Sequence, residues 1–232
     1  MGHPLSFMLM LLAIAFPAPS PTAASSEECT KYSDQFDAYR ADRWHEVLIY
    51  SEAQADFAVQ DGRLMLKSPE NEPCEVQVYS LFTFEGDFDI QVDYDVANER
   101  EELCRFNAGI VLQTLGDEKS YKSYVATTPG KGLFFRARLD HFGEENIESF
   151  KGEPAPQKGV LRLARQSGKV KFSSLVDGQW SEVYEYTEAC PEKLRVRFKL
   201  QTGSDEEEGQ TCPVRVHFDN FMVNSCSRIT EE

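Results

Sequence analysis

Two aspartates on one short stretch have the spacing that best suits chemistry. Asp93 and Asp95 lie in the segment Gln91-Val92-Asp93-Tyr94-Asp95, where alternate residues of an extended chain point to the same side. Carboxyl groups that share a strand face can flank one glycosidic bond, and retaining enzymes hold such a pair about 5–5.5 Å apart. The plainer interpretation, which we favour, is that Asp89, Asp93 and Asp95 form the solvated face of a strand.

One histidine also has an acidic neighbour at strand spacing. His217 and Asp219 are expected to share a strand face with Arg215, so a His–Asp hydrogen bond could form there. An activated nucleophile needs a third partner, which the sequence does not place, and a polar strand face explains the three residues better. The sequence has no Gly-rich phosphate loop and no Gly-x-Ser-x-Gly nucleophile elbow.

Cationic side chains repeat with the same period of two. Arg136 and Arg138 are expected to share one face, as are Arg195 and Arg197 in the row that ends at Lys199. Arginine can grip a carboxylate or sulfate with two hydrogen bonds, which suits an acidic glycan or an acidic partner. The alternative is that these charges only solubilise strands and pair with acidic neighbours. We expect the four arginines on one sheet face.

Aromatic residues offer a second candidate binding surface, and an acidic run offers a weak candidate for calcium binding. Tyr121, Tyr124 and Trp180 lie near predicted strand ends or turns, where a ring can stack on a sugar, although Trp180 could equally cover the edge of a core. The acidic run 205–208 could coordinate calcium through oxygens, but it lacks the spacing of a defined calcium loop, so we expect a hairpin tip there. No cofactor and no bound metal are expected.

The elements that must position these residues are β-strands. Segments 88–96, 194–200 and 214–219 alternate apolar and polar residues without a break, as strands do with one face in a core. Only 33–44 offers a short helix. About eleven strands without alternating helices predict an all-β, antiparallel two-sheet sandwich. The weaker strands are expected at 62–67, 75–84, 108–114, 121–127, 133–139, 160–165, 169–176 and 182–186.

The first 24 residues are typical of an export signal. The apolar run 5–16 is too short to span a bilayer, which needs about 20 residues, and the small residues Thr22-Ala23-Ala24 suit a signal peptidase. Removing 1–24 from the 232 residues leaves 208, which we interpret as a single domain over 25–232. No other stretch approaches membrane-spanning length. The protein is therefore expected to be secreted or periplasmic.

Composition excludes some partners. The chain has 24 Lys plus Arg against 39 Asp plus Glu, a net charge of −15 that would repel nucleic acid and anionic membranes. A hydrophobic fraction of 41% excludes a disordered protein.

Six cysteines follow the export signal, and no two have the Cys-x-x-Cys spacing of a zinc or redox motif. An exported chain with an even number is expected to be fully disulfide-bonded. Of the 15 pairings that six cysteines allow, we favour one that closes two local loops and joins the two ends of the domain. These bridges are Cys29–Cys226, Cys74–Cys104 and Cys190–Cys212.

The order of several loose motifs resembles the concanavalin A-like, laminin-G-like jelly roll over about residues 30–226. Lectins, carbohydrate-binding modules, adhesive modules and glycosidases share that fold, so it does not decide function. The motifs are Gly62-Arg63-Leu64, Gly86-Asp87-Phe88, 108–112, 161–168, Asp177-Gly178-Gln179-Trp180 and Phe218-Asp219-Asn220-Phe221.

The resemblance carries two implications for single residues. The jelly roll brings its first and last strands side by side, which supports the Cys29–Cys226 bridge. Laminarinase-type members carry Glu-x-Asp-x-Glu on one strand, where this chain has Gln91, Asp93 and Asp95. Because the amide of Gln91 can be neither nucleophile nor proton donor, we expect no hydrolysis of β-1,3 or mixed-linkage glucans.

Together these patterns predict a secreted, non-catalytic binding module, with a glycan, including an acidic one, on the concave sheet face. A glycoside hydrolase or lyase with an atypical active site is one alternative. A protein-interaction or structural envelope module, with an extracellular protein as its partner, is the other.

Overall fold

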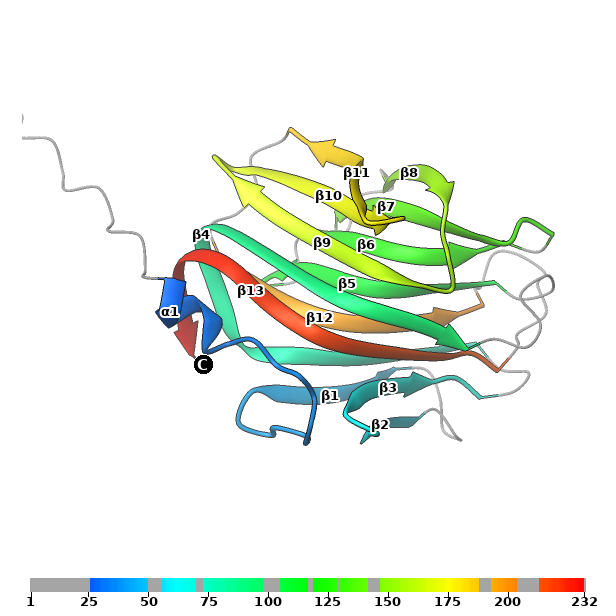
Figure 1. Ribbon diagram of the computed structural model, residues 1–232, viewed down its shortest axis with the longest axis horizontal. Helices are drawn as coiled ribbons and strands as arrows, with labels where there is room; N and C mark the ends of the chain where they lie inside the picture. The colour runs from blue at the N-terminus through cyan, green and yellow to red at the C-terminus, as the bar shows by residue number, and fades with distance from the viewer. Residues whose placement is uncertain are drawn as a thin grey trace, which may run out of the picture.

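The computed structural model describes residues 26–49, 56–69, 73–97, 105–116, 119–128, 130–141, 147–187, 193–203 and 213–231. It is an antiparallel β-structure with one short helix (Figure 1). The expected export signal, the acidic run 205–208 and Cys104, Cys190 and Cys212 lie outside these residues. Within them, no helix has the length and hydropathy that crossing a membrane would require.

Within the described residues the elements are one helix and thirteen strands, slightly more strands than the sequence predicts. Their bounds are α1 Ser26–Thr30, β1 Trp44–Ile49, β2 Asp56–Gln60, β3 Arg63–Lys67, β4 Cys74–Ala97, β5 Phe106–Thr114, β6 Lys119–Thr127, β7 Leu133–His141, β8 Ile147–Pro154, β9 Lys158–Gln166, β10 Lys169–Val176, β11 Gln179–Tyr186, β12 Lys193–Thr202 and β13 Arg215–Glu231.

Two sheets share the long strand β4. In the first sheet, residues 74–85 of β4 pair with β12, and the order continues through β5, β6 and β7 to β8, with β1 on the other side of β4. In the second sheet, residues 88–95 pair with β9, followed by β10 and β11, while β13, β3 and β2 continue from the opposite side of β4. All of these pairs are antiparallel, as the sequence predicts.

The change of sheet within β4 occurs at Gly86. This residue has φ of 73°, a left-handed conformation that favours glycine. A Cβ atom there would also lie 3.0 Å from the Cβ of Ser227 on β13. Both the conformation and the close approach of β13 therefore require glycine at this bend.

The core lies between the two sheets and is filled by the inward residues of each alternating strand. Phe198 of β12 packs 5.2 Å from Phe218 of β13, and Tyr94 of β4 makes an edge contact with Phe135 of β7 at 6.4 Å. Each pair joins strands of different sheets, so burial of these rings holds the sandwich together. Trp44 extends the cluster toward the N-terminal segment.

The helix expected at 33–44 does not form. Asp34 instead makes an isolated β-bridge with Phe221, and its carboxylate accepts hydrogen bonds from the Trp44 indole N–H and the Phe36 backbone N–H, both at 2.8 Å. Phe36 has φ of 53°, which interrupts a right-handed helix. The apolar spacing that suggested a helix places Phe36 and Trp44 in the core as part of a loop.

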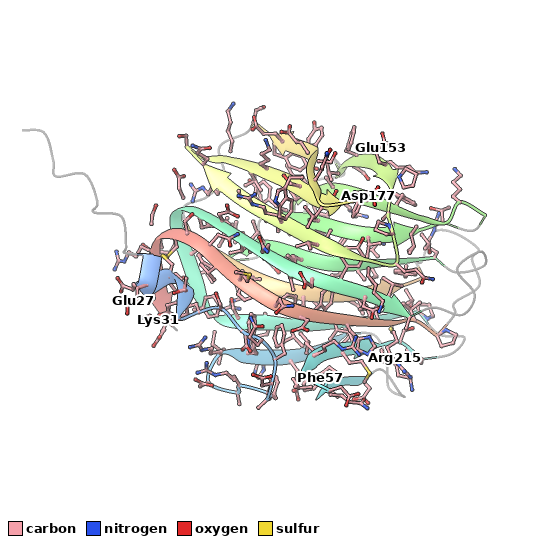
Figure 2. The ribbon with its side chains drawn as sticks, viewed as in Figure 1. Glu27, Lys31, Phe57, Glu153, Asp177 and Arg215 are labelled. Carbon is pink, nitrogen blue, oxygen red and sulfur yellow. A yellow bond between two sulfur atoms is a disulfide. The ribbon has the colours of Figure 1, made fainter. Side chains whose placement is uncertain are left out.

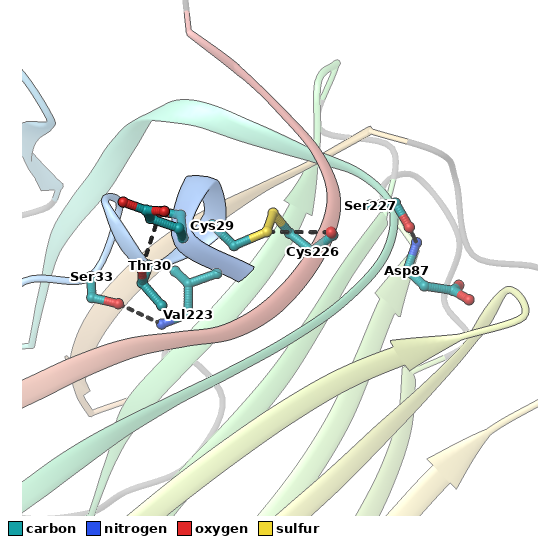
Figure 3. Close-up of a disulfide and its surroundings, with 8 residues drawn as sticks. Cys29, Thr30, Ser33, Asp87, Val223, Cys226 and Ser227 are labelled. Carbon is teal, nitrogen blue, oxygen red and sulfur yellow. Dashed lines mark hydrogen bonds between the residues drawn. A yellow bond between two sulfur atoms is a disulfide. The ribbon is translucent and has the colours of Figure 1, made fainter. Parts of the chain in front are cut away.

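A disulfide joins Cys29 of α1 to Cys226 of β13, as the resemblance implied (Figure 3). The Ser33 hydroxyl accepts a hydrogen bond from the Val223 backbone N–H at 2.9 Å, which adds a second link between the same two segments. Figure 2 shows Glu27 and Lys31 at this end of the molecule and Arg215, the first residue of β13, at the other.

The predicted Cys74–Cys104 bridge is absent from the structure, because Cys74 carries a free thiol. Its sulfur is buried at the start of β4 and accepts a hydrogen bond from the Thr202 hydroxyl at 3.5 Å. Burial raises the pKa of this thiol, which keeps it protonated and slow to react. The pairing Cys190–Cys212 stays a prediction.

We expect a digest of the unreduced protein to contain a Cys29 peptide linked to a Cys226 peptide. The doubly substituted variant Cys29→Ala/Cys226→Ala should lose roughly 4–5 kcal/mol of unfolding free energy in urea, because the bridge closes a loop with a sequence separation of 197. A reducing agent should lower the urea midpoint of the native protein and not that of the variant. A Cys29 peptide linked to another cysteine would contradict the assignment.

Candidate functional site

The four arginines predicted to share a face do so, on the side of the first sheet that points away from the core. Inward residues of β12 such as Val196 and Phe198 are fully buried, so Arg195 and Arg197, which alternate with them, point outward. The same alternation on β7 turns Arg136 and Arg138 outward. Because β12 and β7 belong to one sheet, separated by β5 and β6, all four lie on one face.

We call this surface the basic face. Two rows of cross-strand neighbours define its middle: one runs from Gln77 through Lys199, Gly109 and Tyr124 to Arg136, and the next from Tyr79 through Arg197, Val111 and Lys122 to Arg138. The functional side chains of the basic face are Glu75, Gln77, Tyr79, Lys122, Tyr124, Arg136, Arg138, Asp140, Arg195, Arg197 and Lys199.

Polar side chains of the basic face are unusually buried for the outside of a sheet. Gln77 is 4% exposed, Lys199 6% and Tyr124 2%. Charged residues are almost never buried to this degree unless they are paired. The face is therefore a packed polar layer, unlike the wet outer row of an ordinary sandwich strand.

Two carboxylates anchor this layer. Glu75 accepts from the Lys199 ammonium at 2.7 Å and from the amide of Gln77. Asp140 is ion-paired with both Lys122 and Arg138. Lys122, Arg138 and Lys199 thus have carboxylate partners on the basic face of a protein whose net charge is −15.

Several contacts of the arginines are with neutral groups. Arg136 donates to the Ser149 hydroxyl at 2.9 Å and to the Asn107 side-chain oxygen at 3.3 Å, and Arg197 donates to Gln77 at 2.8 Å. The guanidinium of Arg195 lies 4.7 Å from the ring centre of Tyr79, a cation–π contact. Arg138 also pairs with a carboxylate, that of Asp140.

Burial changes the ionisation of the central groups. It lowers the pKa of Lys199 to about 8, although Glu75 opposes the shift, and it lowers the pKa of Lys122 against the effect of Asp140. Burial raises the pKa of Tyr124 well above its usual value, so its hydroxyl stays protonated at neutral pH. Burial would also raise the pKa of Asp140, but Lys122 and Arg138 outweigh it and the pKa lies below its ordinary value.

The other predicted site residues lie elsewhere. Tyr121 points into the core and is fully buried, with 0% exposure. Its ring packs edge-on against that of Tyr186, with the ring centres 6.0 Å apart. Trp180 is 42% exposed on β11 of the second sheet, where the Arg162 guanidinium lies 5.0 Å from its ring centre. Of the three predicted aromatic residues, only Tyr124 belongs to the basic face.

The aspartates that suggested hydrolysis lie on the outward face of the second sheet. Asp95 is ion-paired with Arg63 at 3.1 Å and with Lys158 at 2.9 Å, and Asp93 accepts from the Asn220 side chain at 2.8 Å. Burial and the nearby Asp219 raise the pKa of Asp93. This agrees with the interpretation of these residues as a polar strand face.

The His217–Asp219 pair has other partners. His217 lies opposite Asp95 on β4, and burial, with Arg63 nearby, lowers its pKa. Asp219 accepts from the backbone N–H of Asn220 at 2.7 Å. Among the residues that the structure describes, no group of three or more His, Cys, Asp or Glu side chains is placed to hold a metal ion.

The sequence analysis missed Glu75, Lys122 and Asp140 as members of the site. Lys122 follows the alternation of the predicted strand 121–127, and Asp140 lies one residue beyond the predicted strand 133–139. Nothing local distinguishes a buried lysine from a solvated one. Their position on the basic face depends on β12 lying between β4 and β5, which is a long-range pairing.

Comparison with solved structures shows the fold. No protein-family model matches the sequence, and no curated protein matches it. An endo-acting O-glycanase from the human gut microbiota is similar with TM-score 0.65 and 16% identity over 84% of this chain and 99% of that one. A GH16 protein of Bacteroides ovatus, solved with a mixed-linkage glucan product, has TM-score 0.61 and 10% identity over 82% and 98%.

A third example is the β-glucanase of Bacillus licheniformis, with TM-score 0.59 and 14% identity over 82% of this chain and 96% of that one. The matches extend over nearly the whole of each solved chain. The protein therefore has the concanavalin A-like jelly-roll fold that the motif order suggested. At sequence identities this low, the similarity establishes the fold only. The role of the site depends on the residues of this chain.

Lys199 should link stability to pH. Because its folded pKa of about 8 lies below the usual lysine pKa of 10.5, the unfolded state binds more protons between these values, and unfolding free energy should rise with pH from 8 to 10. The full shift corresponds to about 3 kcal/mol. Lys199 faces Glu75, Lys122 and Asp140, whose charges modulate this shift.

The measurement is urea unfolding of the native protein and Lys199→Met at pH 7, 8, 9 and 10. The advantage of the variant should shrink as pH rises. Lys171→Met, which removes a half-exposed lysine paired with Glu182 on the second sheet, is the control and should give a nearly constant difference. Parallel curves for the native protein and Lys199→Met would show that Lys199 titrates normally.

Proposed function

We propose that the protein is a non-catalytic glycan-binding module whose ligand lies on the basic face. The observation that carries the proposal is the packed polar layer itself. Glu75, Asp140 and neutral partners orient the hydrogen-bonding and cationic side chains of this layer. The layer lies on the outer side of a sheet, where polar side chains do not have to be buried for the fold to be stable. Polar groups held in fixed positions are what sugar hydroxyl and acidic groups need for recognition.

The fold supports a sugar as the ligand. The solved structures with a similar fold include one from Zobellia galactanivorans in complex with laminaritriose and laminaritetraose, at TM-score 0.59 and 12% identity. That protein binds oligosaccharides on the same kind of scaffold. The chemistry of the basic face, with arginines and lysines in excess, favours an acidic glycan for this chain.

The carboxylates of the basic face do not suit glycoside hydrolysis. A retaining or inverting enzyme needs one carboxylic acid that is protonated at working pH. The pKa of Asp140 is shifted downward, and Glu75 is engaged by Lys199 and Gln77.

A glycoside hydrolase or lyase with an atypical active site is the second candidate. Two observations favour it: the similar structures include glycanases, and a lysine whose pKa is about 8 lies in the range of a general base. Such an enzyme would use Lys199 in place of a carboxylate.

A glycan array of the mature protein, read at 0.1 M and 1 M salt, tests the proposed function. We expect retention of acidic glycans that weakens at high salt, because the Debye length falls from about 10 Å to about 3 Å. Arg136→Gln/Arg197→Gln should lose at least about tenfold in affinity, since each removes a charge-assisted contact. Arg215→Gln, on β13 of the second sheet, is the matched control.

Three results would contradict this proposal in different ways. Release of reducing sugar or of an unsaturated, ultraviolet-absorbing product by the native protein, lost in Lys199→Met, would establish catalysis. Equal binding by Arg136→Gln/Arg197→Gln and the native protein would place the ligand elsewhere. Retention of an extracellular protein and of no glycan would favour the interaction-module alternative.

We further propose that the protein acts outside the cytoplasm. The Cys29–Cys226 disulfide supports this, because such bridges persist in oxidising compartments. Expressed with its own N-terminus in a secreting host, the protein should be recovered from the exported fraction with Ser25 as its first residue. An intact N-terminus on protein retained inside the cell would contradict the export signal.

A further inference from the structure

Tyr124 is the most unusual residue of the basic face. It projects from β6 on the side away from the core, yet its side chain is 2% exposed, and its hydroxyl has no hydrogen-bond partner among the described residues. A buried hydroxyl without a partner destabilises a protein, so such groups are rare and call for a physical reason. A hydroxyl that is complemented by a ligand is one such reason.

Charged side chains of both signs surround this hydroxyl. On one side of Tyr124, its cross-strand neighbour is Arg136 of β7. On the other side the same row continues through Gly109 of β5 to Lys199 of β12. Lys122 precedes Tyr124 by two residues on the same outward side of β6. The charges of Arg136, Arg138, Glu75 and Asp140 all act on the Tyr124 hydroxyl, which places them around it.

The cluster around Tyr124 remains cationic after its internal pairs are formed. Glu75 and Asp140 compensate two positive charges, whereas Lys122, Lys199, Arg136 and Arg138 supply four. An ammonium group has three N–H donors, so a lysine paired with one carboxylate keeps donors for a second acceptor. The carboxylates orient the lysines without neutralising the cluster.

We propose that Tyr124, Lys122, Arg136 and Lys199 form a subsite for one anionic substituent of the glycan, a sulfate ester or a carboxylate. The tyrosine hydroxyl would donate a hydrogen bond to an anionic oxygen, while the lysines and Arg136 supply the charge. An anion suits this subsite better than a sugar hydroxyl, because it balances the excess charge that burial makes costly. The inference rests on the proposed glycan-binding function and names its ligand class.

Tyr124→Phe is the sharpest test, because it removes one oxygen atom and keeps the ring. Deleting a hydroxyl that has no protein partner should leave the melting temperature unchanged or raise it. The same substitution should weaken binding of a defined anionic oligosaccharide at least about tenfold, since it removes a hydrogen bond to a charged group. A merely structural tyrosine would show the opposite pattern, with a lower melting temperature and unchanged binding.

The probes are a chondroitin sulfate hexasaccharide, an oligogalacturonate hexasaccharide and uncharged laminarihexaose, each titrated calorimetrically at pH 7. The first two distinguish a sulfate ester from a carboxylate. Lys199→Met should lose affinity for the anionic probe that binds, whereas Tyr184→Phe and Lys171→Met, both on the second sheet, should not. Laminarihexaose should bind weakly and equally to all variants.

The outcomes separate this inference from the proposed function. If an uncharged glycan binds best, or if Tyr124→Phe and Lys199→Met leave anionic binding unchanged, the subsite is wrong and glycan binding stands. If no oligosaccharide binds, the proposed function fails. The anion subsite can then still be tested by adding inorganic sulfate and measuring the melting temperature. Sulfate should then raise the melting temperature of the native protein more than that of both variants, and an equal effect would overturn the subsite as well.

Discussion

The structure depends on one strand that belongs to both sheets. β4 pairs with β12 through its first half and with β9 through its second, and β13 follows it around the bend. The bend requires a left-handed residue with no side chain, which Gly86 supplies. Because every other strand joins a sheet directly or indirectly through β4, the two faces of the sandwich are set by where this strand turns.

The two outward faces that result differ in how they balance charge. On the second sheet, cations and carboxylates pair across strands near solvent, as Arg162 does with Asp89 and Lys171 with Glu182. Such pairs contribute little to stability and mainly keep a sheet soluble. On the basic face, Lys199 is buried beside Glu75, an arrangement that costs more stability than a surface pair and motivates the proposed binding role.

The link between the molecule's ends has a simpler role. The Cys29–Cys226 disulfide and the hydrogen bond between Ser33 and Val223 tie the N-terminal segment to β13, beside the Asp34–Phe221 bridge and the Trp44 cluster. These contacts lie at the edge of the first sheet and do not include residues of the basic face. A covalent tie at this position restricts the unfolded chain.

The sequence by itself determined most of the strands, though not β1, β2 and β8. It also determined the inward and outward residues of those strands and the shared face of the four arginines, because side-chain direction in a strand follows a period of two. It misassigned 33–44 as a helix, since the spacing of Phe36 and Trp44 fits a loop that packs on the core as well as a helix. Only the tertiary structure decided that β12 lies between β4 and β5, which brings Lys199 beside Glu75 and into the row of Tyr124. Burial and pairing of this kind arise from strands distant in the sequence, and no local pattern encodes them.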